Sequence, residues 1–218
     1  MTDLVIVGAG GFARETAAAA AAARRRVRGF VDDDPALHGT TRSGLPILGP
    51  VDSVVSMPDT AVVVCVGNPR DYTARQRIVH RLGLPEDRYA TIVHPSAELG
   101  AGSAVGPGTV LLAGVVLTAD VTVGAHVACM PQAVFTHDCR VGDYATVASG
   151  VRLGGGACLS AGSYTGSGAL IREGVTVGEG SLVGMGSVVL RDVPAGEVWA
   201  GNPAGFLRFT KALEEKTA

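Results

Sequence analysis

The sequence is poor in charge, in long apolar runs and in paired cysteines. Charged residues make up 17% of the 218, and the formal net charge is −2, so no basic surface for nucleic acid or an anionic membrane is indicated. The longest aliphatic runs are about six residues, against the roughly 20 that a membrane-spanning helix needs. We therefore expect no membrane span and no nucleic-acid partner.

Signs of export are also missing. The start, MTDLVIVGAGGF, lacks the basic region that precedes the apolar part of a signal peptide. The cysteines form no C-x-x-C motif: they are Cys65, Cys129, Cys139 and Cys158. We predict a cytoplasmic protein whose cysteines are reduced.

What the sequence does have is a six-residue repeat from residue 91 to about residue 194. Counting from Val93 in steps of six, every position up to Val189 is apolar except Thr165. The residue two places earlier is small or β-branched, and glycine often follows directly. A period of six fits neither an amphipathic helix nor an alternating strand, so each repeat must contain a turn. A β-sandwich is disfavoured because its turns would be irregularly spaced.

Three such hexads can form one triangular coil whose sides are short strands. The large aliphatic residue then stacks inside the prism, and the small residue fits near a corner. Successive coils hydrogen-bond at the usual strand spacing of about 4.8 Å. We predict a parallel β-helix over residues 91–196. A capping segment over 197–218, with a helix from about Phe206 to Glu215, would cover the last open strand edges.

The first 90 residues follow a different pattern. A strand over residues 3–8 leads through a glycine-rich turn into an alanine-rich helix from about Phe12 to Arg24. A second strand ends at Asp32, a third runs from Ala61 to Val66, and a helix follows from about residue 69 to 82. A last strand near residues 89–93 enters the repeat. This order predicts a Rossmann-like α/β half-domain over residues 1–90.

The turn in this half-domain reads G-x-G-x-x-A. Bare backbone N–H groups and a helix N-terminus at such a turn can hold a phosphate. The acidic residues that end the second strand stand where a ribose-binding acid belongs. The candidate residues for a nucleotide-linked substrate are Gly10, Gly11, Phe12, Asp32, Asp33, Gly67 and Asn68.

The half-domain admits two other interpretations. A nicotinamide-dependent dehydrogenase would use a complete doubly wound sheet of about 150 residues, and the half-domain is too short for that. A degenerate domain that binds nothing stays open. The phosphate-binding turn and the acidic strand end favour a nucleoside diphosphate.

Several segments together resemble one group of enzymes. They are VIVGAGGFARE, GFVDDDP, LPILGP, VCVGNPR, IVHPSA, FTHDCRVGDY and the closing GNPA. With the hexads, they resemble the hexapeptide-repeat acyltransferases that carry an N-terminal nucleotide-binding domain, the sialic acid O-acetyltransferases and nucleotide-amino-sugar N-acetyltransferases. The resemblance implies a left-handed β-helix, a homotrimer with active sites between protomers, and acetyl-CoA bound along the groove between prisms.

By the same resemblance, His137 is the candidate general base and Asp138 its partner. His137 comes two places after the inward Phe135, where the register turns a side chain away from the prism. Acetyl transfer needs a base for the proton of the attacking group, and histidine titrates in a suitable range. The implied residues for acetyl-CoA are Thr146, Gly155, Ser167 and Met185. The histidines form no H-x-x-x-x-H pair, so no metal site is expected.

Three positions depart from the group's pattern. Met130 replaces an asparagine, Thr146 replaces a second histidine, and Phe12 replaces a histidine in the first turn. The sequence therefore predicts an acetyl-CoA-dependent N-acetyltransferase acting on a nucleotide-linked amino sugar. An O-acetyltransferase acting on a sugar or another hydroxyl compound, and a non-catalytic hexapeptide scaffold, stay open as alternatives.

Overall fold

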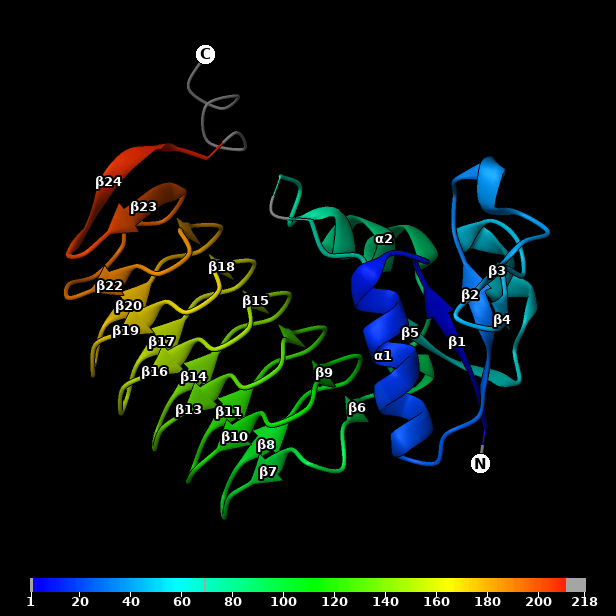
Figure 1. Ribbon diagram of the computed structural model, residues 1–218, viewed down its shortest axis with the longest axis horizontal. Helices are drawn as coiled ribbons and strands as arrows, with labels where there is room; N and C mark the ends of the chain where they lie inside the picture. The colour runs from blue at the N-terminus through cyan, green and yellow to red at the C-terminus, as the bar shows by residue number, and fades with distance from the viewer. Residues whose placement is uncertain (1, 69, 211–218) are drawn as a thin grey trace.

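The computed structural model describes residues 2–68 and 70–210, and it places an α/β domain beside a β-helix (Figure 1). The α/β domain has a parallel sheet in the order β2-β1-β5. Its strands are β1 (Asp3–Val7), β2 (Val27–Val31) and β5 (Thr60–Val64), and its helices are α1 (Gly11–Ala22) and α2 (Ala74–Leu82).

The two faces of this sheet are covered by different helices. Leu4 and Ile6 pack with α1, whereas Val5 and Val7 pack with α2 and the short helix η2 (Val51–Ser56). All four strand residues are fully buried. A strand that is covered on both faces is apolar at every position, which explains the uninterrupted LVIV run.

Short elements that the sequence did not predict complete the domain. They are the hairpin of β3 (Thr41–Arg42) and β4 (Leu45–Pro46), and the 3-10 helices η1 (Pro35–Leu37) and η3 (Glu86–Arg88).

Two predicted boundaries in the domain were wrong. The helix predicted from residue 69 begins at Ala74, because Asn68 Oδ1 accepts a hydrogen bond from Arg70 N and makes a turn first. Pro69 lies outside the described residues. The strand predicted near residues 89–93 is interrupted: Tyr89 forms an isolated bridge to Val62, and β6 (Ile92–Val93) belongs to the β-helix.

The predicted parallel β-helix is confirmed. Its strands are two residues long, and every third strand stacks on the same face of the prism. The domain face carries β6, β9 (Val110–Leu111), β12 (Ala128–Cys129), β15 (Thr146–Val147), β18 (Tyr164–Thr165) and β21 (Leu182–Val183). The second face carries β7 (Glu98–Leu99), β10 (Val116–Leu117), β13 (Val134–Phe135), β16 (Arg152–Leu153), β19 (Leu170–Ile171) and β22 (Val188–Val189). The third face carries β8 (Ala104–Val105), β11 (Thr122–Val123), β14 (Arg140–Val141), β17 (Cys158–Leu159) and β20 (Thr176–Val177).

The interior of the prism is the predicted aliphatic column. From Leu111 to Val189 the sixth-position side chains are buried, whereas Leu99 in the first coil is 43% exposed because no earlier coil covers it. Glycine follows many of these side chains because the coils approach closely there. A Cβ on Gly142, for example, would lie 2.6 Å from the backbone nitrogen of Ala161 in the next coil.

The last coil is capped by a hairpin. β23 (Glu197–Gly201) pairs with β21, and β24 (Ala204–Phe209) pairs antiparallel with β23. The predicted helix from Phe206 was therefore wrong as far as Phe209, where the backbone joins the ladder of β23 and so satisfies its N–H and C=O groups. Residues 211–218 lie outside the described residues.

The α/β domain packs on the domain face of the β-helix (Figure 1). Ala13, Ala17 and Ala20 of α1 share one buried cluster with Ile92 and Val110 of the β-helix. Small side chains on the helix let its backbone approach the flat face closely. The alanine-rich composition of α1 therefore serves the contact between the domains.

Two threonines inside the prism give a test of this interior. Thr165 is fully buried, and among the described residues its hydroxyl has no hydrogen-bond partner. Thr109 is equally buried, but its hydroxyl donates to Gly124 O at 2.7 Å and accepts from Val127 N at 2.9 Å. We expect Thr165→Val to raise the free energy of unfolding by about 1 kcal/mol, because it removes an unsatisfied polar group.

The matched change Thr109→Val should lower the free energy of unfolding by about 2 kcal/mol, because it leaves Val127 N unpaired. Denaturant unfolding of both variants and the wild type measures the difference. Equal destabilisation by the two substitutions would contradict this account of the interior.

Candidate active site

His137 and Asp138 form the turn between β13 and β14, at the corner of the second and third faces. His137 Nδ1 lies 2.8 Å from Asp138 Oδ2, and both side chains are about two-thirds exposed, at 69% and 67%. A carboxylate at Nδ1 favours the tautomer whose proton is on that nitrogen. Nε2 is then left as the acceptor, on a side chain that is largely exposed. The geometry suits a general base.

Gly155 lies directly against this histidine, one coil further along the same corner. A Cβ on Gly155 would come within 2.5 Å of both Cε1 and Nε2 of His137. The missing side chain therefore makes room for the imidazole ring. The structure thus brings together three residues that the sequence singled out, His137, Asp138 and Gly155.

Ser167 and Met185 lie at a different corner, between the domain face and the second face. Ser167 follows β18 and Met185 follows β21, so the two are one coil apart. Both are exposed, and Met185 is 80% exposed. Within one chain, these two residues are not grouped with His137.

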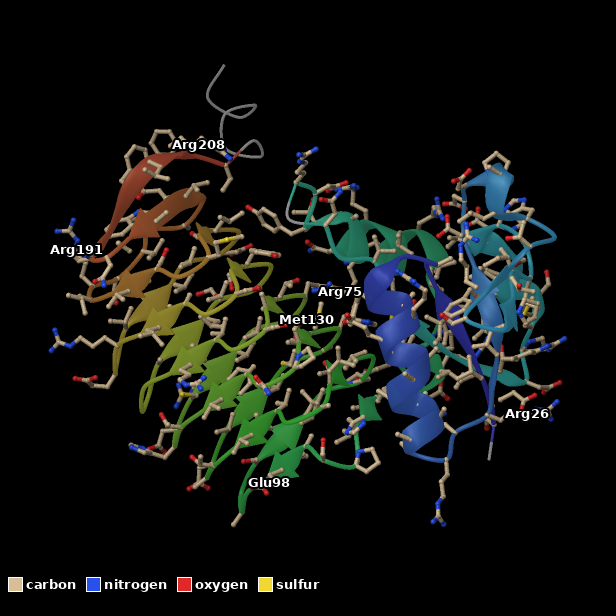
Figure 2. All side chains as sticks on the ribbon, in the orientation of Figure 1. Arg26, Arg75, Glu98, Met130, Arg191 and Arg208 are labelled. Carbon is tan, nitrogen blue, oxygen red and sulfur yellow. The ribbon has the colours of Figure 1, made fainter. Side chains whose placement is uncertain are left out.

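Thr146 and Met130 face the α/β domain. Thr146 on β15 is buried, and its hydroxyl accepts a hydrogen bond from Arg75 Nη2 at 3.0 Å. Met130 follows β12 and packs against the cluster that contains α1. Figure 2 shows Met130 and Arg75 between the two domains. Met130, which stands where the resembled group has an asparagine, therefore lies in the domain junction of this chain.

The glycine-rich turn lies at the carboxyl end of the parallel sheet. Gly10 is the N-cap of α1 and supplies no side-chain hydrogen bond to the first helical turn. Gly10 and Gly11 are exposed, and a Cβ on either would meet nothing within 4 Å. Uncapped N–H groups at an open helix N-terminus are suited to a phosphate.

The loop after β5 lies beside this turn. A Cβ on Gly67 would be 3.6 Å from Phe12 Cδ1, so Gly67 covers the Phe12 ring, which is buried. Gly67 and Asn68 are both exposed. Four of the predicted nucleotide-sugar residues thus gather at one edge of the sheet: Gly10, Gly11, Gly67 and Asn68.

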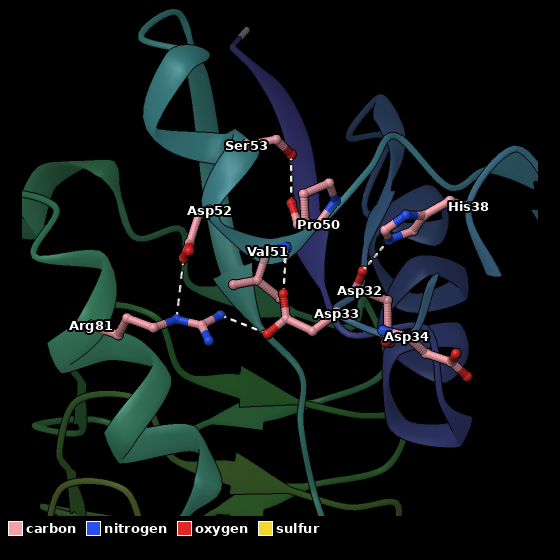
Figure 3. Close-up of polar contacts among 9 residues, drawn as sticks. All are labelled: Asp32, Asp33, Asp34, His38, Pro50, Val51, Asp52, Ser53 and Arg81. Carbon is pink, nitrogen blue, oxygen red and sulfur yellow. Dashed lines mark hydrogen bonds and ion pairs between the residues drawn. The ribbon is translucent and has the colours of Figure 1, made fainter. Parts of the chain in front are cut away.

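The two predicted aspartates point to different partners (Figure 3). Asp32 Oδ2 accepts from Ala9 N at 2.8 Å, and its Oδ1 accepts from Asp34 N at 3.0 Å, so this carboxylate shapes the glycine-rich turn. Asp33 instead accepts from Val51 N at 2.9 Å and from Arg81 Nη2 at 2.7 Å.

Arg81 also pairs with Asp52, which ties α2 to η2 (Figure 3). Burial by itself would raise the pKa of Asp33, but the hydrogen bonds from Arg81 and Val51 lower it overall. The Asp33 carboxylate is therefore ionised and held by the domain itself, beside the glycine-rich turn rather than in it.

Sequence reasoning missed the polar centre of the domain junction. Arg75 on α2 is 1% exposed, and its guanidinium donates to backbone carbonyls and to Thr146, with no carboxylate among these partners. Burial lowers the pKa of Arg75 to about 10, so the group stays charged at neutral pH. Nothing in the helical pattern marks this arginine as buried, because its acceptors come from a distant segment.

His126 was also missed as part of this junction. Its ring stacks on Tyr144 with the centroids 5.2 Å apart, and Tyr89 meets it edge-on at 4.6 Å. Burial, followed by the charge of Arg75, lowers the pKa of His126 to about 4. The histidine is therefore neutral at pH 7. Its only sequence signal was its place one coil before Tyr144.

Comparison with known proteins covers both domains. The family model described as PglD N-terminal domain matches residues 3–82. UDP-N-acetylbacillosamine N-acetyltransferase of Bacillus subtilis (strain 168) is 35% identical over 66 residues, which are 28% of this chain. This match spans only 29% of that relative's length.

Solved structures of two proteins, among others, match nearly the whole chain. The acetyltransferase domain of PglB from Neisseria gonorrhoeae FA1090 is 28% identical, with a TM-score of 0.85 over 95% of this chain and 100% of that chain. Its complex with acetyl coenzyme A gives a TM-score of 0.84. PerB from Caulobacter crescentus, in complex with CoA and GDP-perosamine, is 29% identical, with a TM-score of 0.75 over 95% of this chain and 98% of that chain.

Within residues 2–68 and 70–210, no helix is both long and apolar enough to cross a membrane. No group of three or more histidine, cysteine, aspartate or glutamate side chains is arranged there to hold a metal ion.

The buried His126 predicts a pH effect on stability. Its pKa is about 4 in the folded protein against 6.5 when exposed, so the unfolded chain binds more protons between these values. We expect the free energy of unfolding to fall as the pH is lowered from 6.5 to 4, by up to about 1.4 kcal/mol per pH unit from this residue.

The matched variant is His126→Asn, since asparagine tolerates the left-handed conformation (φ 55°) of this position. Denaturant unfolding at several pH values measures both proteins, and the difference isolates His126 from the carboxylates common to both. Parallel pH curves would show that the His126 pKa does not change on folding.

Proposed function

We propose an activity for this chain from the family to which it belongs, the PglD-like nucleotide-sugar N-acetyltransferases, which combine a PglD N-terminal domain with a hexapeptide β-helix. In this proposal the protein transfers the acetyl group of acetyl-CoA to the amino group of a nucleotide-linked sugar. The solved relatives with acetyl coenzyme A, and with CoA and GDP-perosamine, support both substrates.

One observation carries the proposed assembly. His137 lies at the corner opposite the domain face, whereas the α/β domain of the same chain packs on that face. A nucleotide sugar held at Gly10 and Asn68 is therefore on the far side of the prism from the base. A second copy can supply the missing half of the site, so we propose active sites between protomers, in the homotrimer that the family resemblance implies.

In the proposed mechanism, the neutral amine of the sugar attacks the thioester carbonyl of acetyl-CoA. His137 Nε2 takes a proton from the amine as the C–N bond forms. The tetrahedral intermediate then collapses, the C–S bond breaks, and the CoA thiolate leaves and takes up a proton. Asp138 holds the tautomer and stabilises the imidazolium. We assign the oxyanion to a backbone N–H group, because the Thr146 hydroxyl is buried on the domain face, away from the His137 corner.

We place the acetyl-CoA beside the two prism corners that carry the predicted residues. Gly155 lies under His137, where the thioester must come, and Ser167 and Met185 line the next corner. In a trimer, the His137 corner of one prism and the Ser167 corner of its neighbour can border one groove. We propose that the reaction takes place in the cytoplasm, consistent with four free cysteines.

The first test measures thiol release from acetyl-CoA against a panel of UDP-, GDP- and dTDP-linked amino sugars, with the matching hydroxyl sugars as controls. We expect release with at least one amino sugar and an alkali-stable amide product. Release only with hydroxyl sugars, giving an ester cleaved by mild alkali, would replace the N-acetyl proposal with O-acetylation. A folded trimer that is silent across the panel would favour a scaffold.

Replacing the proposed base tests its role. We expect His137→Ala to lower kcat by roughly 10² to 10⁴, because general base catalysis is lost. The trimer should persist, since the side chain is exposed and packs in neither core. Steady-state kinetics and native mass measurement check both points, with His94→Ala as the histidine control. Unchanged turnover in His137→Ala would remove this residue from the mechanism.

The contact between Gly155 and His137 gives an independent test. A methyl group at Gly155 would overlap the imidazole ring, so we expect Gly155→Ala to displace the ring and lower kcat by about tenfold or more. Gly205→Ala is the matched control, because a Cβ there meets nothing within 4 Å. Steady-state kinetics of both variants measure the effect. Equal kcat values for Gly155→Ala and Gly205→Ala would mean that the position of the imidazole ring is not critical.

A further inference from the structure

We propose that Arg75 is a positioning residue, which fixes the height of the nucleotide-binding domain on the β-helix at the coil that carries His137. The inference rests on the proposed function, and it concerns a residue that does not touch the reacting atoms. Arg75 leaves α2 and enters the junction between the domains, where it is 1% exposed (Figure 2).

All three nitrogen atoms of the guanidinium are used. Nε donates to His126 O at 2.7 Å, and Nη2 donates to Tyr144 O at 2.6 Å and to Ala145 O at 3.0 Å. Nη1 donates to Val66 O at 3.2 Å, in the loop that leads to Gly67 and Asn68. One rigid planar group therefore joins the proposed nucleotide-binding loop to the β-helix.

The acceptors on the β-helix mark one particular coil. His126 and Tyr144 hold the same corner position in successive coils, as their stacked rings show. The chain between them runs through β12, β13 and β14 and contains His137. Arg75 thus bonds to both ends of the coil that carries the proposed base.

A second contact follows the same column of corners. His126, Tyr144 and Gly180 all have left-handed backbone conformations, with φ of 55°, 60° and 62°. Tyr72, just before α2, donates its hydroxyl to Gly180 O at 2.7 Å. Arg75 and Tyr72 therefore recognise repeating carbonyl groups at two different heights of the column.

The β-helix has a nearly repeating surface, so apolar contacts alone do not define the height of a domain packed on it. A shift by one coil would move the domain by about 4.8 Å. A buried charge without a carboxylate partner defines the height sharply, because any displaced position loses hydrogen bonds to a desolvated cation. If equivalent coils lie at the same height in every protomer, the hydrogen bonds of Arg75 also set the height of the nucleotide sugar relative to His137 of the neighbouring protomer.

The test compares Arg75→Met and Arg75→Lys with Arg77→Met. Arg77 lies on the same helix but is exposed and pairs with Asp71 at the surface, so it is the matched control. We expect Arg75→Met to lower kcat/KM for the nucleotide sugar by about 10², since misplacement of about 1 Å can cost this much. The Kd for acetyl-CoA should stay within about twofold, because its proposed site lies on the prism.

Arg75→Lys keeps the charge, but lysine has only one nitrogen for the acceptors on the α/β domain and on the β-helix. We therefore expect an intermediate loss of kcat/KM for the nucleotide sugar. Arg77→Met should match the wild type. Tyr72→Phe keeps the ring and removes one hydrogen bond, and it serves if Arg75→Met does not fold. We expect it to lower kcat/KM for the nucleotide sugar in the same direction by a smaller factor.

Hydrogen exchange of residues 66–68 provides a readout that does not depend on activity. Exchange should be faster in Arg75→Met than in Arg77→Met. Suppose that the wild type transfers the acetyl group and that the folded Arg75 variants have an unchanged kcat/KM for the nucleotide sugar. This result would overturn the positioning role and leave the proposed function intact. An inactive wild type would instead overturn the proposed function. Equal losses for acetyl-CoA and sugar would indicate a general structural defect and also overturn the proposal.

Discussion

The stacking of one coil directly on the next is the constraint on which the rest of the structure depends. Each strand bonds to the strand one coil away, with parallel register throughout the prism. Glycine at positions such as Gly142 lets the backbones approach, and Thr109 bonds two coils together where a buried N–H would otherwise be unpaired. Because the coils are regular, a residue's place in the hexad fixes its face, its corner and its height. His137 and Gly155 meet for this reason alone.

A regular prism offers no unique place for a second domain, and the junction shows how this chain defines one. The alanine face of α1 supplies an apolar contact of low specificity, whereas Arg75 makes directional bonds to the ends of a single coil. The neutral, stacked His126 and the half-buried Met130 also lie in this junction. The junction therefore combines a flat apolar contact with one buried cation that sets position.

The same geometry explains why the proposed chemistry needs more than one chain. The α/β domain covers one face of the prism, and the proposed base lies at the corner opposite that face. The edge of the sheet that presents Gly10, Gly11 and Asn68 lies within one chain, and so does the His137 turn. In the proposed assembly, the two half-sites come from neighbouring chains.

The repeat by itself determined the β-helix, because a period of six allows only a turning chain, and the G-x-G-x-x-A turn with its strand and helix determined the α/β half-domain. The place of His137, Asp138 and Gly155 at one corner of the prism was predictable from the hexad register, whereas their roles stay predictions from the family resemblance. The sequence did not predict the cap hairpin, the hydrogen bond from Arg81 to Asp33, or the burial of Arg75 and Thr146. These features depend on groups from distant segments, and only the tertiary structure decides which carbonyls and carboxylates a given side chain will meet.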